Sequence, residues 1–425
     1  MNRSIKEGEK TVLIVALLIS AVLTARASGM FGDVIAAMTG ALPAGSVASA
    51  DAGGTVSAEA ARPYLIVVTG ADGTRATAAY DDDARDALYE KTGSIMNEAL
   101  ASATEPVKCA ESEWRAALSS PGVMIEYYSE VPLALARGWL GAPAGGSRLS
   151  IRRLCLVFSD GPSSLYCEGS DGFYRAEAAS LGGDKTVPAV YSGNIKYEFE
   201  TDSDSAAPYM LLLSDDSPRR AASASNPLAL DGVLPAVLSP LGIDARHSPG
   251  YTDADGSERY VTSAASASVS PDGLITYRRA VSAGGVADNA EMSEESFAVE
   301  TAYRTVAAVG SYAGAARIYF TDVEAAGDSD SDSNSDSFVV SFDYYLSGAR
   351  VFFPEREHAV SVTITDGEIA EMTFLFREYS FSGAVALLPE RQALAACGGT
   401  FKLGYSDGGS GDASPFWYAE GDNGQ

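Results

Sequence analysis

Histidine is the first residue type to consider for chemistry, and the sequence holds only His247 and His358, far apart in the chain. A zinc site or a catalytic triad built on histidine is therefore not expected. We predict a solvated or hydrogen-bonded role for each. The chain also lacks GxSxG, GxxxxGK and a GxGxxG that follows a strand. These absences favour a protein that is not an enzyme, with no catalytic residues and no cofactor.

An acidic stretch from Asp328 to Ser337 reads DSDSDSNSDS and invites a calcium interpretation, because carboxylate oxygens are ligands for that ion. The EF-hand pattern fails, since its sixth position would be Ser333 in place of Gly and its twelfth Val339 in place of Glu. We therefore predict a solvated hairpin loop and no metal site.

The four cysteines are Cys109, Cys155, Cys167 and Cys397, which form neither a dense disulfide framework nor a CxxC pair. Cys155 and Cys167 flank a predicted hairpin that turns near Gly161. Equal distance from the turn would place them opposite each other on one face, where a disulfide could form. The alternative is two buried free thiols.

Tryptophan is the remaining candidate for ligand contact, as a platform for a sugar ring. Trp114, Trp139 and Trp417 each stand beside apolar neighbours in the sequence. We predict that they pack in the core.

A membrane-directed segment is the clearest feature among the elements that must position these residues. Thr11 to Thr24 is an uncharged apolar run, enclosed by Lys10 and Arg26. It is short for a transmembrane helix, which needs roughly 20 apolar residues, but flanking basic side chains can reach the interface. The basic tail before it favours a cytoplasmic N-terminus and an extracytoplasmic remainder. The alternative is a signal peptide cleaved after Ala27.

The net charge of −27 argues against a nucleic-acid partner, because phosphates would be repelled. The hydrophobic fraction of 46% is ordinary for a folded globular protein. We expect an α+β protein in which an N-terminal transmembrane helix precedes a two-domain ectodomain of antiparallel sheets with packed helices. The predicted parts are the tail and span at 1–28, a stalk at 29–60, an N-terminal domain at 61–222 and a β-rich C-terminal domain at 223–425.

Within these domains the pattern predicts helices and strands in an order typical of α+β folds. Asp-Gly turns between alternating runs predict two hairpins, one over 267–278 and one over 362–372. The polar stretch 214–226 is interpreted as a linker. Helices are predicted over 80–101, where Gly93 interrupts the pattern, from Ser112, and over 293–309 with Ser293 as the N-cap.

Three stretches resemble the YycH/YycI group of membrane-anchored regulators from Gram-positive bacteria. The stretch Trp114 to Gly141 (WRAALSSPGVMIEYYSEVPLALARGWLG) resembles the first domain of YycH-like proteins. SPDGLITYR (Ser270 to Arg278) and Ser341 to Tyr379 resemble the β-rich repeat units that YycH and YycI share. The resemblance contains no catalytic signature.

This resemblance implies a non-enzymatic protein of the cell membrane that binds and modulates the sensor histidine kinase of a cell-wall two-component system, together with a second YycH/YycI-type protein. In the predicted span, Ala16, Ser20 and Ala21 offer small side chains for contact with a partner helix. The alternative function is a secreted extracytoplasmic binding module for a cell-wall fragment or peptide.

Overall fold

The computed structural model describes the chain from residue 62 onward, within a compact unit that runs from Ala52 to Gln425. The described residues are 62–78, 80–143, 147–181, 195–201, 208–212, 219–248, 250–280, 293–309, 312–326, 337–389, 392–393 and 401–419.

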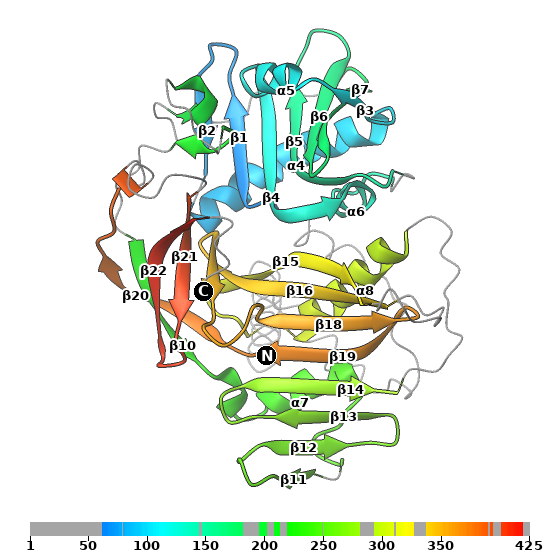
Figure 1. The fold of residues 1–425 in the computed structure, drawn as a ribbon, viewed down its shortest axis with the longest axis vertical. Helices are drawn as coiled ribbons and strands as arrows, with labels where there is room; N and C mark the ends of the chain where they lie inside the picture. The colour runs from blue at the N-terminus through cyan, green and yellow to red at the C-terminus, as the bar shows by residue number, and fades with distance from the viewer. Residues whose placement is uncertain are drawn as a thin grey trace, which may run out of the picture. The chain divides into compact units, whose positions relative to one another are not determined.

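The first sheet has seven strands, all antiparallel, in the order β2-β1-β4-β5-β6-β7-β3. Figure 1 shows β1, β4, β5 and β6 side by side. In sheet order the bounds are β2 Arg75–Thr77, β1 Leu65–Thr69, β4 Gly122–Pro132, β5 Ser150–Val157, β6 Ser163–Gly169, β7 Gly172–Ala178 and β3 Val107–Cys109. A separate pair is formed by β8 (Lys196–Tyr197) and β9 (Leu211–Leu212).

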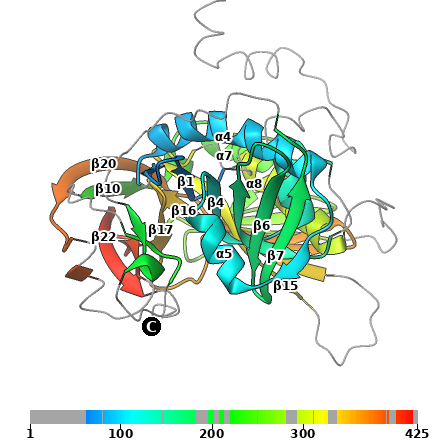
Figure 2. The ribbon, with the colours of Figure 1, turned by 90° about the horizontal axis from the view of Figure 1, so that it is seen from above.

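Both faces of this sheet are covered. Helices α4 (Asp82–Ser102) and α6 (Leu133–Trp139) pack on one face, and α5 (Glu111–Leu118) packs on the other. Figure 2 shows α4 alongside β1, β4, β6 and β7. Alternate residues of β1 therefore enter different cores, Ile66 that of α4 and Val67 that of α5. This explains the continuous apolar run of the strand, because a strand that is buried on both faces does not alternate between apolar and polar residues.

The predicted helices are present, with two corrections. Asp81 is the N-cap of α4 and accepts a hydrogen bond from the Ala84 N–H at 3.0 Å. The helix continues through Gly93 without a break, because one interior glycine costs only about 1 kcal/mol and the buried face of α4 outweighs it. Helix α5 begins at Glu111, so Ser112 lies inside its first turn and Ala110 occupies the N-cap position.

The second sheet has 13 strands among the described residues, ordered β11-β12-β13-β14-β19-β18-β16-β17-β21-β22-β10-β20, with β15 paired to β16. Pairing is antiparallel except between β17 and β21. The bounds are β11 Gly250–Thr252, β12 Glu258–Val261, β13 Ala265–Val269, β14 Leu274–Arg279, β19 Glu368–Leu375, β18 Val360–Thr365, β16 Ser337–Leu346, β17 Ala349–Phe352, β21 Phe401–Asp407, β22 Asp412–Ala419, β10 Arg219–Ser225, β20 Glu378–Val385 and β15 Ala316–Ala325. The expected α+β class with mostly antiparallel sheets is confirmed for the described residues.

Both predicted Asp-Gly hairpins are confirmed, as β13–β14 and β18–β19. They are neighbours, because β14 pairs with β19 along its length, as Figure 1 shows. Asp366 and Gly367 have positive φ angles of 50° and 77°, which is the conformation that a type I′ hairpin turn requires.

Helix α8 (Glu294–Val309) covers β16 and β18 of the second sheet. Ser293 caps it as predicted, accepting from the Ser296 N–H at 3.2 Å, and Ala302 and Val306 are buried. The short helix α7 (Val233–Leu238) packs against α8.

The linker predicted over 214–226 is wrong in its second half. Residues 219–225 form β10, which lies between β22 and β20 in the second sheet. Its sequence RRAASAS lacks the large apolar residues of a typical strand, and Ala222 is the one residue of β10 that is fully buried. The strand is held mainly by its backbone pairing with β20 and β22, whose residues lie about 150 to 190 positions later in the chain.

Candidate binding site

The two sheets meet where β4 leaves its neighbour in the first sheet. Pairing between β4 and β5 shifts between Glu126 and Val131, so the intervening residues are released from β5. Tyr128 lies in this released segment. Its ring stacks on Tyr319 of β15, with centroids 4.3 Å apart, and contacts Tyr345 of β16 at 4.0 Å. These three rings join the first sheet to the second.

Beside the tyrosines, one carboxylate is shared by two arginines from distant parts of the chain. Asp86 of α4 accepts from both terminal nitrogens of Arg317 on β15, at 2.9 and 2.6 Å, and from Nη1 of Arg62 at 2.9 Å. Burial favours the neutral acid, but Arg317, Arg62 and Arg85 outweigh it and lower the pKa of Asp86. The hydrogen bonds to Asp86 raise the pKa of Arg317. The three side chains are 24 to 29% exposed, so this ion-pair cluster is largely shielded from water.

A third arginine lies deeper at the same junction. Arg85 is 1% exposed and forms an ion pair with Asp82. Burial opposes its charge, yet the neighbouring Tyr128 and Tyr319, with Asp82, raise its pKa overall. Gly348 has a φ of +82°, a conformation that favours glycine, and a Cβ atom there would lie 2.9 Å from Arg85 Nη1. Three arginines thus face two carboxylates here, although the chain as a whole carries −27.

A cavity of about 320 Å³ opens beside the ion-pair cluster, and its wall includes Arg62, Arg317, Tyr303 and Tyr319. Its volume is at the lower end of the range for small-molecule sites. The apolar walls come from α8, β15 and the turn between them, through Val306, Ala307, Ala313, Ala316 and Ile318. We call this the junction cavity.

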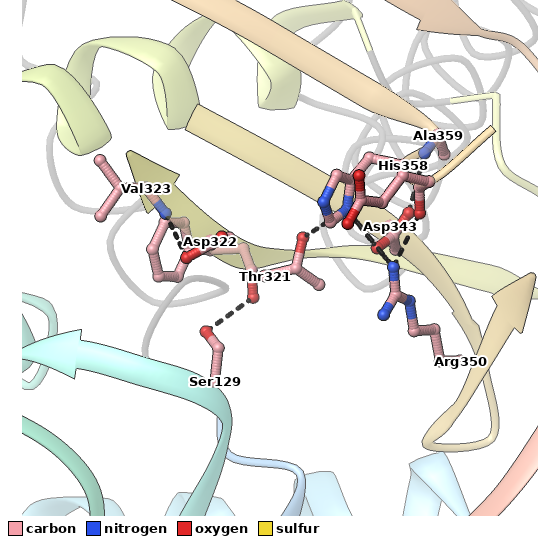
Figure 3. A network of polar contacts seen from close by, with 10 residues as sticks. Ser129, Thr321, Asp322, Val323, Asp343, Arg350, His358 and Ala359 are labelled. Carbon is pink, nitrogen blue, oxygen red and sulfur yellow. Dashed lines mark hydrogen bonds and ion pairs between the residues drawn. The ribbon is translucent and has the colours of Figure 1, made fainter. Parts of the chain in front are cut away.

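A second polar network lies further along β15 and β16 (Figure 3) and includes one of the two histidines. Asp343 is fully buried, and its Oδ1 accepts from the Ala359 N–H at 2.8 Å. Its Oδ2 lies 2.7 Å from Nη2 of Arg350 and 3.0 Å from Nδ1 of His358. Burial opposes the charge of Arg350, but Asp343 outweighs it and raises the arginine pKa.

The same network brings a hydroxyl to the histidine, since Thr321 Oγ1 lies 3.5 Å from His358 Nδ1. A serine-protease relay requires the carboxylate on one ring nitrogen and the nucleophile on the other. Here both contact Nδ1, so this arrangement does not form that relay. The network instead ties β16, β17 and the start of β18 together, and Ser129 extends polar contact to β4 by donating to the Phe320 carbonyl at 3.4 Å (Figure 3).

His358 therefore has the hydrogen-bonded role predicted for it. His247 is exposed and contacts Asp244 at 2.7 Å, far from His358 in the sequence. Within the described part of the chain, no group of three His, Cys, Asp or Glu side chains could hold a metal ion. The acidic stretch 328–336 lies outside the described residues.

The prediction that Cys155 and Cys167 lie directly opposite each other on paired strands is wrong by one residue. Cys167 pairs with Leu154, and Cys155 with Tyr166. A slip of one residue moves a side chain to the other face of a strand. Cys155 therefore enters the core under α5 and Cys167 the core under α4, and both are free thiols. Burial raises the pKa of each to about 12. Cys397 lies outside the described residues.

The tryptophans lie apart from one another. Trp114 is fully buried against Phe173, with ring centroids 5.7 Å apart. Trp139 is 6% exposed, and its indole N–H donates to Glu300 of α8 at 3.1 Å. Core packing is therefore confirmed for these two. Trp417 is only partly buried and donates to the Leu388 carbonyl at 2.8 Å.

The predicted contact surface of Ala16, Ser20 and Ala21 lies outside the described residues, as does the whole run 11–24. None of the described helices is long and apolar enough to cross a membrane.

Sequence reasoning missed the residues of the junction cavity. Arg62 and Asp86 are 24 positions apart, and Arg317 is 231 positions from Asp86. No local pattern singles out Tyr128 as the contact residue, because a strand that is buried on both faces shows no alternation of apolar and polar residues.

No family model, no curated protein and no solved structure matches this chain.

Proposed function

We propose that this protein is a membrane-anchored extracytoplasmic regulator that modulates the sensor histidine kinase of a two-component system through its transmembrane helix and ectodomain. A second protein of the YycH/YycI type is a further proposed partner, and the proposed role is non-enzymatic. Support comes from the apolar run 11–24 with its basic tail, and from the resemblance of three stretches to that group.

The structural observation that supports this proposal best is where two of the resembling stretches meet. Trp114 to Gly141 supplies Tyr128, and Ser341 to Tyr379 supplies Tyr345. The centroids of these two rings are 4.0 Å apart, so the rings are in contact between the first sheet and the second. The residues that carry the resemblance are therefore also residues that join the two sheets. A regulator that transmits a signal through its ectodomain requires such a coupling between its parts.

Separating membranes from medium and measuring the intact mass of the native protein tests the anchor. A full-length chain in the membrane is expected. A released chain that begins at Ser28 would overturn contact through the transmembrane helix. The second step is to scramble residues 11–24 at constant composition and measure co-purification with the kinase, with Ser20→Cys providing a cross-linking position. The scrambled chain should stay in the membrane and lose the kinase; unchanged co-purification would refute recognition by the helix.

The second candidate function is an extracytoplasmic binding module for a cell-wall fragment or peptide. The junction cavity favours it, because the cavity combines apolar walls with two arginines and two tyrosines. A muramidase digest of peptidoglycan, added to the full-length protein in detergent, should raise its melting temperature. An unchanged melting temperature at saturating digest would argue against this function.

A further inference from the structure

We propose that the junction cavity binds the carboxylate of a small ligand with an apolar body, of the kind found at the free C-terminus of a peptide that ends in a small residue. This inference rests on the second candidate function and names its ligand class. Two observations carry it: the charge balance at the cavity, and the size and nature of the remaining surface.

The charge balance favours one further negative group. Arg62 and Arg317 share the single carboxylate of Asp86. Arg317 donates to both carboxylate oxygens of Asp86, one from each terminal nitrogen, whereas Arg62 donates to Asp86 from Nη1 alone. A guanidinium has five N–H donors in a planar fork, so Arg62 retains donors for a second carboxylate. A surplus of one positive charge suits a carboxylate better than a phosphate dianion.

The cationic side chains in the wall of the cavity are Arg62 and Arg317. Arg62 would hold the ligand carboxylate by charge-assisted hydrogen bonds, through the donors that Asp86 does not take.

The rest of the wall limits the body of the ligand. Val306 and Ala307 of α8 and Ile318 of β15 are apolar. The volume of about 320 Å³ accommodates one or two small residues and excludes a large glycan. A peptide end with alanine-sized side chains fits both the polar and the apolar parts of this wall.

Isothermal titration calorimetry on the full-length protein in detergent tests the proposal, with N-acetyl-alanyl-alanine as the probe. The matched probe is the same dipeptide with an amidated C-terminus, which keeps the size and removes the charge. The free acid should bind saturably, and the amide at least about tenfold more weakly, because the amide cannot form the charge-assisted hydrogen bonds with Arg62. No saturable binding of the acid, or equal binding of both probes, would overturn the proposal.

Two variants locate the binding. Arg62→Gln removes the charge, and Ala307→Leu fills the space without changing charge; each should weaken binding of the acid about tenfold or more. Arg304→Gln is the matched control, because Arg304 also lies on α8, is 61% exposed and pairs with Glu300 away from the cavity wall. Retained affinity in Ala307→Leu, with the fold checked by circular dichroism, would contradict the assignment.

These outcomes are separable from those of the second candidate function. If the peptidoglycan digest raises the melting temperature while the dipeptide acid does not bind, the binding function stands and the carboxylate assignment falls. If the acid binds and the digest has no effect, the cavity recognises carboxylates from a source other than the cell wall.

Discussion

Replacing Asp86 with Asn removes the carboxylate that Arg62 and Arg317 share, while keeping nearly the same shape. A fully exposed ion pair contributes about 0–1 kcal/mol, and breaking a buried one costs about 3–5 kcal/mol. Asp86 is 24% exposed and is held at 2.6 to 2.9 Å by two guanidinium groups. We therefore expect the free energy of unfolding to fall by about 2 kcal/mol, between these limits.

Urea denaturation of the full-length protein in detergent, followed by tryptophan fluorescence at neutral pH, measures this loss. Glu371→Gln is the matched control, because Glu371 pairs with Arg278 on the surface, where both side chains are at least 50% exposed. The control should lie within about 0.5 kcal/mol of the wild type. If Asp86→Asn is no more destabilising than Glu371→Gln, the inference that this cluster joins the two sheets is wrong.

The same variant has a pH signature. The arginines lower the pKa of Asp86 in the folded state, so its contribution to stability is present above its unfolded pKa of about 3.9 and is lost as the pH falls through the folded value. The difference in stability between wild type and Asp86→Asn should therefore be largest near neutral pH and shrink below about pH 4. A difference that stays constant from pH 7 to pH 3 would show that shape, and not charge, causes the effect.

Three other predictions follow from the core. Trp114→Ala should cost about 3–5 kcal/mol in urea denaturation, since Trp114 is fully buried against Phe173; a loss under 1 kcal/mol would refute that packing. Gly348→Ala should cost about 2 kcal/mol, because Gly348 has a φ of +82° and its new Cβ would meet Arg85, whereas Gly383→Ala has no such contact and serves as the control. Cys155 and Cys167 should resist iodoacetamide in the native protein and react after denaturation without reductant; a native disulfide would leave them unreactive in both states.

The features predicted correctly from the sequence are those with a local physical cause. The hairpin at Asp366-Gly367 was correct because its turn needs positive φ angles at both residues, and in the hairpin at Asp272-Gly273 the positive φ falls on Gly273. The start of α4 was correct because Asp81 can accept from the first turn of the helix. Both signals operate within four residues and do not depend on the rest of the fold.

The errors arise where distant residues decide the structure. The disulfide prediction failed because the hairpin turn is centred half a residue before Gly161, which moves Cys167 opposite Leu154. Strand β10 was missed because its pairing with β20 and β22 holds it, and its own composition resembles a linker. The junction cavity could not be predicted, since Arg62, Asp86 and Arg317 meet only after both sheets have formed.

Measurements on Asp86→Asn distinguish a purely structural role of the ion-pair cluster from a role in ligand binding. If its cluster serves only to join the sheets, Asp86→Asn lowers stability and leaves binding of a dipeptide acid unchanged. If the cavity binds a carboxylate, the variant removes a negative group that competes for the same arginines. The variant should then be less stable and bind N-acetyl-alanyl-alanine more tightly. This relation is expected where the charges of a binding site are arranged for a ligand and the fold loses stability as a result. Weaker binding in Asp86→Asn would instead mean that Asp86 orients the arginines for the ligand, and Arg317→Lys, which keeps the charge and loses the planar fork, would then weaken binding as well.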